Sequence, residues 1–262
     1  MPRIMPVVVF RTLLVAGTLV ALADGAPAQT TTEYSAEARF QLDLQVPDAA
    51  IGPFLPPGWA LNVATQGNAK DCNLRVIFVD RLSISAPDGK PVGRGSNRFV
   101  YLAVPARDAT GTNVQLMIGG LTEDPADAPG PFGVYLAATT HTMQRSTSSS
   151  GSGPILDTQD WVFGAATGER LELHIKYQRG VANKSNPSEV RFHSAKNPSV
   201  YQISRQEQVL EVLRNVTTTP PDRVKEFSFK GSGGSYAKLF DGTERVVSWD
   251  NVLWMNRAVL LP

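Results

Sequence analysis

Alternation of apolar and polar residues runs through most of the chain and predicts many short β-strands. The first clear case places Phe40, Leu42, Leu44 and Val46 on one side of an extended segment, the period-two pattern of a half-buried strand. Glycine- and proline-containing turns, such as 87–89, separate the runs that follow. We predict strands at 59–64, 74–84, 98–105, 113–119, 132–140, 159–164, 170–178, 188–194, 225–230 and 246–260.

Two segments have helical signals instead. Residues 48–55 follow Pro47 with a short apolar turn of helix, which the Pro56-Pro57-Gly58 sequence ends. Residues 204–216 begin with a Ser204/Glu207 capping-box pattern and continue with apolar residues at helical spacing. We therefore predict a mainly β (α+β) fold, a closed or nearly closed antiparallel β-barrel or cone with one or two side helices.

The first 28 residues are typical of a secretory signal. Arg3 and Arg11 flank a short apolar segment at 13–22, and Ala26-Pro27-Ala28 supplies the small-residue pattern of a cleavage site. The apolar segment is shorter than the roughly 20 residues that cross a bilayer. We expect 1–28 to be a cleavable signal peptide, 29–36 a polar tether and 37–262 a single barrel domain. The mature protein is then periplasmic or secreted, with no membrane insertion after cleavage.

Charge and cysteine content exclude several partners. Lys and Arg total 25 against 24 Asp and Glu, without a basic block, so the chain has no sign of nucleic-acid binding. Cys72 is the only cysteine, which excludes an intramolecular disulfide, and we interpret it as a small buried residue. The expected partner is a small-molecule ligand, and no feature specifies an oligomeric state.

Local motifs offer little catalytic chemistry. The sequence contains no metal-ligand spacing and no nucleotide-phosphate loop, so no cofactor and no metal are predicted. Ser235 and Lys238 match a short S-x-x-K motif that occurs in penicillin-recognising enzymes. The surrounding glycines predict a turn rather than the buried helix this chemistry needs, which leaves a serine hydrolase as a remote alternative.

Strict alternation over 170–178 leaves two readings open. Leu171, Leu173, Ile175 and Tyr177 share one face, whereas Glu172, His174 and Lys176 share the other. A polar strand face is usually solvated, but it faces inward in a barrel that encloses a polar ligand. In the second case Glu172, His174 and Lys176 are candidates for acid–base or amine chemistry.

Three segments resemble acetoacetate decarboxylase-like proteins. These are a strand ending in Val46-Pro47-Asp48 with a short helix and 55–59 after it, the turn and long strand from 168 to 173, and the closing strands at 241–244 and 254–262. The resemblance implies a barrel or cone with a ligand-sized cavity. It also implies decarboxylation of a β-keto acid through a Schiff-base lysine, whose pKa an adjacent lysine lowers.

The strand at 133–145 corresponds to the family's lysine-bearing strand but contains no lysine. His141 stands where the amine is expected, and an imidazole forms no stable Schiff base. If the protein is an enzyme, we expect lyase-like, decarboxylase-related chemistry on a small keto acid or ketone, with His141 transferring protons and Arg145 holding a carboxylate. The alternative is a non-catalytic periplasmic protein that binds a small carbonyl-bearing, carboxylate-bearing or apolar ligand on the same barrel.

The signal-peptide assignment predicts the N-terminus of the mature protein. Mass spectrometry of protein from the native host should find a chain that begins at or near Gln29, because the cleavage pattern ends at Ala28. Cytoplasmic protein that retains residues 1–28 would contradict this prediction.

Overall fold

The computed structural model describes residues 29–127, 129–218 and 221–261. The expected signal peptide therefore lies outside the described residues. The strands, in chain order, are β1 Thr30–Gln45, β2 Ala60–Leu61, β3 Leu74–Ser85, β4 Asn97–Arg107, β5 Asn113–Thr122, β6 Tyr135–Ser148, β7 Leu156–Ala165, β8 Arg170–Gln178, β9 Asn183–Lys184, β10 Ser188–Ser194, β11 Tyr201–Asn215, β12 Val224–Ser232 and β13 Arg245–Leu261.

Short helical turns complete the fold. They are α1 Asp48–Ile51, and the 3₁₀ turns η1 Gly52–Phe54, η2 Pro125–Asp127 and η3 Gly234–Lys238. The predicted short helix at 48–55 is thus confirmed, with Ile51 fully buried. Within the described ranges, no helix has the length and hydropathy to cross a membrane.

A ring of strands closes the barrel. β4, β5, β10, β11, β13, β1 and β3 pair in that order, and β3 returns to β4. All of these pairings are antiparallel except the short parallel contact between β5 and β10. This architecture confirms the predicted β-rich barrel and refines it with one parallel contact.

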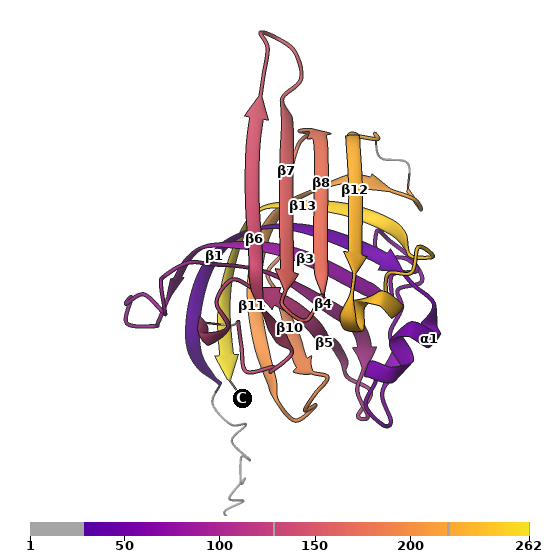
Figure 1. The fold of residues 1–262 in the computed structure, drawn as a ribbon. Coiled ribbons are helices and arrows are strands. Elements are labelled where there is room, and N and C mark those ends of the chain that lie inside the picture. The colour runs from indigo at the N-terminus through magenta and orange to yellow at the C-terminus, as the bar shows by residue number, and fades with distance from the viewer. Residues whose placement is uncertain (1–28, 128, 219–220, 262) are drawn as a thin grey trace, which may run out of the picture.

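A second sheet, β6–β7–β8–β12, lies across the outside of the barrel (Figure 1). β6 begins beside β5 through the pairing of Gly120 with Tyr135, and then leaves the barrel to pair with β7. Gly120 permits this approach, because a Cβ atom there would lie 2.6 Å from the Tyr135 ring. The β6–β7 hairpin projects beyond the rest of the molecule (Figure 1).

The main hydrophobic core lies between this sheet and the outer face of the barrel. Trp161 packs 5.8 Å from Phe78 of β3 between ring centroids, and Tyr177 packs 6.4 Å from Phe40 of β1. A smaller apolar cluster inside the barrel includes Phe99. The interior is thus mixed: an apolar cluster occupies part of it, and the remainder is available for polar side chains.

Two predictions about chain segments are wrong. The predicted helix at 204–216 is most of β11, which pairs with β13 along its length and with β10 and β9 on its other side. These tertiary pairings outweigh local helix propensity. The predicted polar tether at 29–36 is instead the first half of β1, which pairs with β13 and β3.

Candidate functional site

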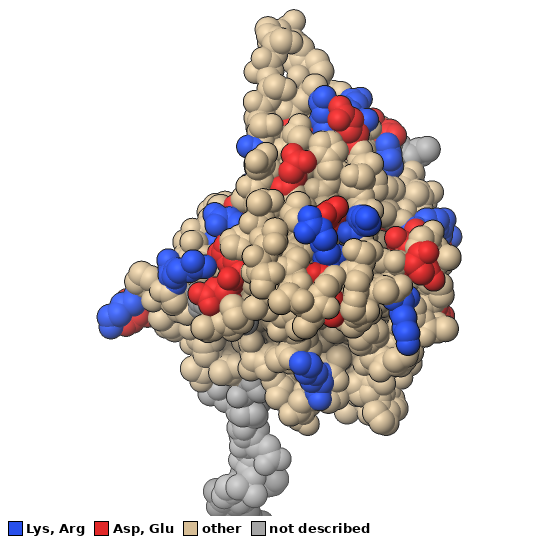
Figure 2. Space-filling view, in the orientation of Figure 1, with Lys and Arg blue, Asp and Glu red and all other residues tan. Residues whose placement is uncertain are grey.

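The residues predicted from 170–178 lie on the surface. In β8 the apolar set is buried in the core between the layers, and the polar set forms the opposite, outward face. His174 Nδ1 lies 2.7 Å from Asp160 Oδ1, and this hydrogen bond raises the pKa of His174. Lys176 Nζ lies 2.8 Å from Glu226 Oε1. Lys, Arg, Asp and Glu side chains are interspersed on the outward face (Figure 2).

His141 and Arg145 belong to the opposite face of the same sheet. The register pairs His141 with Phe163, and Phe163 with Leu171, so these three side chains share the face toward the barrel. His141 is 43% exposed, with its Nε2 3.3 Å from Glu123 Oε2. Arg145 lies over the Trp161 ring. Glu172, His174 and Lys176 are therefore separated by the sheet from His141 and Arg145, and a shared catalytic role for the five stays a prediction.

The barrel interior brings together a different set of polar residues. Along β1, Glu37, Arg39, Gln41 and Asp43 alternate with apolar residues that belong to the outer core. From β3, Arg75 and Arg81 join them. These side chains reach the interior because strand alternation turns one face of each barrel strand toward the axis.

Glu37 is the centre of a buried ionic cluster. Arg39 Nε donates to Glu37 Oε2 at 2.7 Å, and Arg257 Nε lies 2.9 Å from Glu37 Oε1. Ser35 Oγ donates to Glu37 Oε1 at 2.7 Å, and Arg81 Nε is 3.7 Å away. Burial alone would raise the pKa of Glu37, but Arg257, Arg39 and Arg81 outweigh it and lower that pKa to about 2.

Beside this cluster lies a cavity of about 230 Å³ inside the barrel. Its lining combines charged and amide groups with a few apolar side chains: Arg39, Gln41, Asp43, Asn68, Ala69, Arg75, Ile77, Tyr101, Gln115, Val190, Phe192, Gln206, Gln208, Asp250, Val252 and Met255. None of these lining residues is a lysine. The loop that carries Asn68 lies at the end of the barrel and is held there by Asn215, whose Nδ2 donates to the Asn68 carbonyl at 2.6 Å.

Three polar atoms in the cavity lining are shielded from solvent and have no hydrogen-bond partner within the described protein. They are Gln115 Oε1, Gln206 Oε1 and Arg75 Nε, and the last of these still has an ion pair with Asp43 Oδ1 at 3.4 Å. Leaving such a group unsatisfied costs roughly 1–3 kcal/mol. These groups are therefore suited to a polar ligand, because a bound molecule with complementary groups would satisfy them.

A carboxyl pair also faces this cavity. Asp43 accepts a 2.8 Å hydrogen bond from Gln41 Nε2, and its Oδ1 lies 3.4 Å from Arg75 Nε. Asp250 accepts a 2.7 Å hydrogen bond from Ser248 Oγ. Burial and the neighbouring Asp43 raise the pKa of Asp250 to about 7. The cavity thus contains a cation, an acid paired with that cation, and a second acid that holds its proton near neutral pH.

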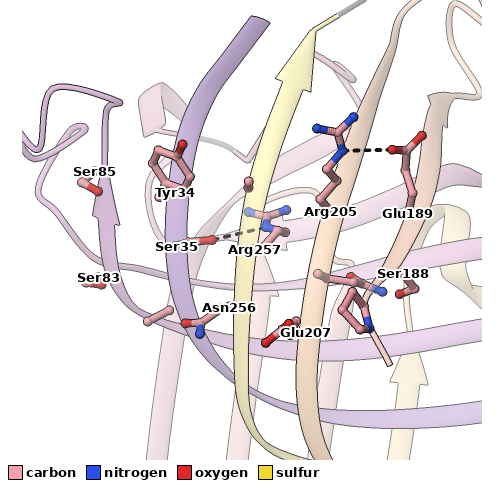
Figure 3. Close-up of a pocket in the computed structure, with 14 residues that line it drawn as sticks. Tyr34, Ser35, Ser83, Ser85, Ser188, Glu189, Arg205, Glu207, Asn256 and Arg257 are labelled. Atoms are coloured by element: carbon pink, nitrogen blue, oxygen red, sulfur yellow. Dashed lines mark hydrogen bonds and ion pairs between the residues drawn. The ribbon is translucent and has the colours of Figure 1, made fainter. Parts of the chain in front are cut away.

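A larger hollow of about 620 Å³ lies on the outer face of β1, β3, β10, β11 and β13 (Figure 3). Tyr34 and Arg205 line it, and both are exposed. Its ion pair, Arg205 with Glu189 at 3.1 Å, is solvated, and such pairs contribute little free energy. The barrel interior is the better candidate, since several of its polar atoms are shielded from solvent and lack a hydrogen-bond partner within the described protein.

The structure also shows the positions of Ser235 and Cys72, the two other residues singled out from the sequence. Ser235 lies in η3, with its backbone N–H donating to Glu169 Oε1 at 3.2 Å. Gly234 permits this contact, because a Cβ atom there would lie 2.1 Å from Glu169 Oε1. Cys72 is buried, and burial raises the pKa of its thiol to about 12. Among the described residues, no group of His, Cys, Asp and Glu is arranged to hold a metal ion.

Sequence reasoning missed the interior site because its residues look like a solvated strand face. Glu37, Arg39 and Asp43 alternate with apolar residues just as surface residues do. One signal was present: Arg75 and Arg81 occur within the otherwise strongly apolar run of β3. Charged side chains within such an apolar run indicate that their strand face lines a polar interior and not the solvated surface.

Comparisons with known proteins identify the fold. No protein-family model matches the chain, and no curated protein sequence matches it. Among solved structures, it is similar to the enduracididine biosynthesis enzyme MppR in complex with the condensation product of pyruvate and imidazole 4-carboxaldehyde, with a TM-score of 0.54, 12% identity and 90% of each chain covered. It is also similar to an acetoacetate decarboxylase-like enzyme from Sphingomonas wittichii RW1, with a TM-score of 0.54, 12% identity, and 89% of this chain and 94% of that one covered. The resemblance predicted from the sequence is confirmed at the level of the fold.

The Glu37 cluster predicts a large loss of stability on neutralisation. Glu37→Gln leaves Arg39 and Arg257 without their shared anion, so we expect the free energy of unfolding to fall by about 3–5 kcal/mol in urea titrations. Glu189→Gln removes an exposed carboxylate and should cost under about 1 kcal/mol. Equal effects of the two substitutions would contradict the role given to Glu37.

Asp250 predicts a pH dependence of stability. The folded protein keeps this proton up to about pH 7, whereas an unfolded aspartate ionises near its ordinary value of 3.8. The folded state then binds more protons between these values, so Asp250 lowers stability as pH rises from about 4 to 7. Asp250→Asn should be more stable than wild type at pH 8, by on the order of 4 kcal/mol, with a smaller difference at pH 4.

Urea unfolding at the two pH values measures this difference. The control is Asp241→Asn, because Asp241 is exposed and its hydrogen bonds with Thr243 lower its pKa. An Asp250→Asn variant less stable than wild type at pH 8 would refute the assignment of the raised pKa.

Proposed function

We propose that the barrel interior binds a small molecule that carries a carbonyl or carboxylate group. The proposal is carried by the cavity of about 230 Å³ inside the barrel, which contains the Arg75 cation and two shielded acceptor atoms, Gln115 Oε1 and Gln206 Oε1, without hydrogen-bond partners within the described protein. Arg75 supplies a cation for the ligand's carboxylate oxygen. The Oε1 atoms of Gln115 and Gln206 are acceptors for an O–H or N–H group of the ligand. Arginine is well suited to this contact, because its planar fork matches a carboxylate.

The cavity volume limits the size of the ligand. Pockets for drug-sized molecules have volumes of about 300–1,000 Å³, so a cavity of about 230 Å³ suits a smaller metabolite. The polar lining favours an oxygen-rich compound over a purely apolar one. The ligand of the MppR complex, a condensation product of pyruvate, is of a compatible chemical kind.

A Schiff-base mechanism is not part of this proposal. The sequence contains lysines, but none lines the cavity. A ketone bound beside Arg75 therefore has no amine among the lining residues to attack it. Any turnover in this cavity depends on its carboxyl groups and arginines.

We also propose that the protein acts outside the cytoplasm, in the periplasm or after secretion. The charged n-region, short apolar segment and small-residue cleavage pattern within residues 1–28 support this location. The ligand would then be a molecule that the protein encounters after export.

Binding of three probes tests the site. Pyruvate and acetoacetate carry a carboxylate and acetone does not, so calorimetric titration should detect the two acids and favour them over acetone. Arg75→Gln should weaken pyruvate binding by roughly 10- to 100-fold, the loss of one charge-assisted interaction. Arg205→Gln, in the outer hollow, should leave it unchanged.

Two outcomes would overturn the proposal. One is unchanged pyruvate affinity in the Arg75→Gln variant. The other is a lysine adduct of acetoacetate or acetone after borohydride reduction, which mass spectrometry would detect and which would restore a Schiff-base mechanism.

A further inference from the structure

Asp43 and Asp250 are neighbours across a pair of barrel strands. The β1–β13 register places Gln41 opposite Asp250 and Asp43 opposite Ser248. Asp43 and Asp250 are therefore diagonal neighbours on one face, a spacing that lets side chains interact. Both line the cavity that contains Arg75.

The surroundings of the two carboxyl groups differ. Burial raises the pKa of Asp43, and Arg75, which lies 3.4 Å from its Oδ1, opposes this and favours the ionised form. Asp250 has a hydrogen bond from Ser248 and no ion pair among the described contacts. The charged and titratable groups near the pair are Arg75 on β3, the Cys72 thiol beside Asp43, and Arg39 on β1 and Tyr101 on β4, which line the same cavity. From β11 and the 68–69 loop, the lining adds uncharged groups such as Gln208.

A carboxyl pair with one anion and one retained proton is suited to acid–base work. Like charges held close together cannot both ionise easily, so one member keeps its proton. Burial and Asp43 hold the pKa of Asp250 near 7, which supports the same division of roles. A carboxylic acid kept neutral in this way can donate a hydrogen bond to a developing oxyanion.

We infer that Asp43 and Asp250 form an acid–base pair that interconverts the keto and enol forms of a small keto acid held by Arg75. This inference rests on the proposed binding function and adds a reaction to it. The substrate class is a keto acid with a hydrogen on the carbon next to its ketone. The reaction needs no cofactor, because both proton carriers are side chains of the cavity.

The step balances within the site. The Asp43 carboxylate removes a proton from the carbon next to the ketone, and that C–H electron pair forms the carbon–carbon double bond. The carbonyl π electrons move to oxygen, which takes the proton of Asp250. The products are an enol, a protonated Asp43 and an ionised Asp250. Asp43 can then exchange its proton with solvent. The reverse step restores the starting state and leaves a solvent hydrogen on the carbon.

A purely structural role explains this arrangement less well. Burying two acids of which only Asp43 has an ion pair costs free energy that apolar residues of similar volume would avoid. The Glu37 cluster, by contrast, surrounds its carboxylate with Arg39, Arg257 and Arg81. Asp43 and Asp250 are thus the incompletely compensated acids of the interior, and both are next to space that a ligand can occupy.

Proton exchange measures the proposed step directly. In D₂O, wild-type protein should accelerate loss of the pyruvate methyl signal in ¹H NMR above the rate in buffer. Asp43→Asn and Asp250→Asn should each lower this enzymatic rate by about 100-fold or more, as expected for an acid–base group. Both variants should retain pyruvate binding in calorimetry, and Asp241→Asn, an exposed aspartate, should retain full exchange.

The wild-type pH profile provides a second readout that needs no variant. Exchange should decline as pH rises through about 7, because Asp250 then loses the proton it donates. Pyruvate binding without accelerated exchange, or exchange unaffected by both substitutions, would overturn the acid–base pair and leave the binding proposal standing. Absence of pyruvate binding to the wild type would instead overturn both.

Discussion

The buried carboxylate of Glu37 imposes the main constraint on this structure. An ionised group inside a protein needs compensating charges, and Glu37 obtains them from β1, β3 and β13 through Arg39, Arg81 and Arg257. Three adjacent strands must therefore keep their register for the cluster to form. A slip of one residue would turn these side chains outward and apolar residues inward. The ionic cluster thus favours one strand register in the closed barrel over registers shifted by a residue.

This constraint also explains where the hydrophobic core lies. The inward positions of β1 are polar, so its apolar residues face outward, together with Val76 and Phe78 of β3, and this apolar face needs a cover. The β6–β7–β8–β12 sheet provides it, with Trp161 and Tyr177 packed on Phe78 and Phe40. The second sheet therefore buries the apolar face that the polar inward positions of β1 leave on the outside of the barrel.

The sequence predicted the fold well wherever one strand face is apolar. The ranges 170–178 and 188–194 agree with β8 and β10 to the residue. The prediction of a helix at 204–216 failed because Ser204, Gln206 and Gln208 of β11 turn toward the barrel interior. The apolar residues of this strand are therefore left at a spacing that resembles a helix. The interior site was not predicted for the same reason. The sequence around Glu37 and Asp43 contains no local pattern that distinguishes an interior strand face from a solvated one. That distinction depends on which strands meet in the ring, and contacts distant in sequence determine it.

Similarity of fold does not carry the Schiff-base chemistry to this chain. A barrel supplies an enclosed volume and a set of inward positions, and the residues at those positions determine the reaction. Here the inward positions hold arginines, carboxyl groups and amides instead of lysine. A lysine amine can bind a ketone covalently, whereas Arg75 can bind a charged group of the ligand only through hydrogen bonds and charge. The groups that react with the ligand must therefore already lie beside the bound ligand. Asp43 and Asp250 meet that requirement, because β1 and β13 place both of them on the wall that Arg75 adjoins.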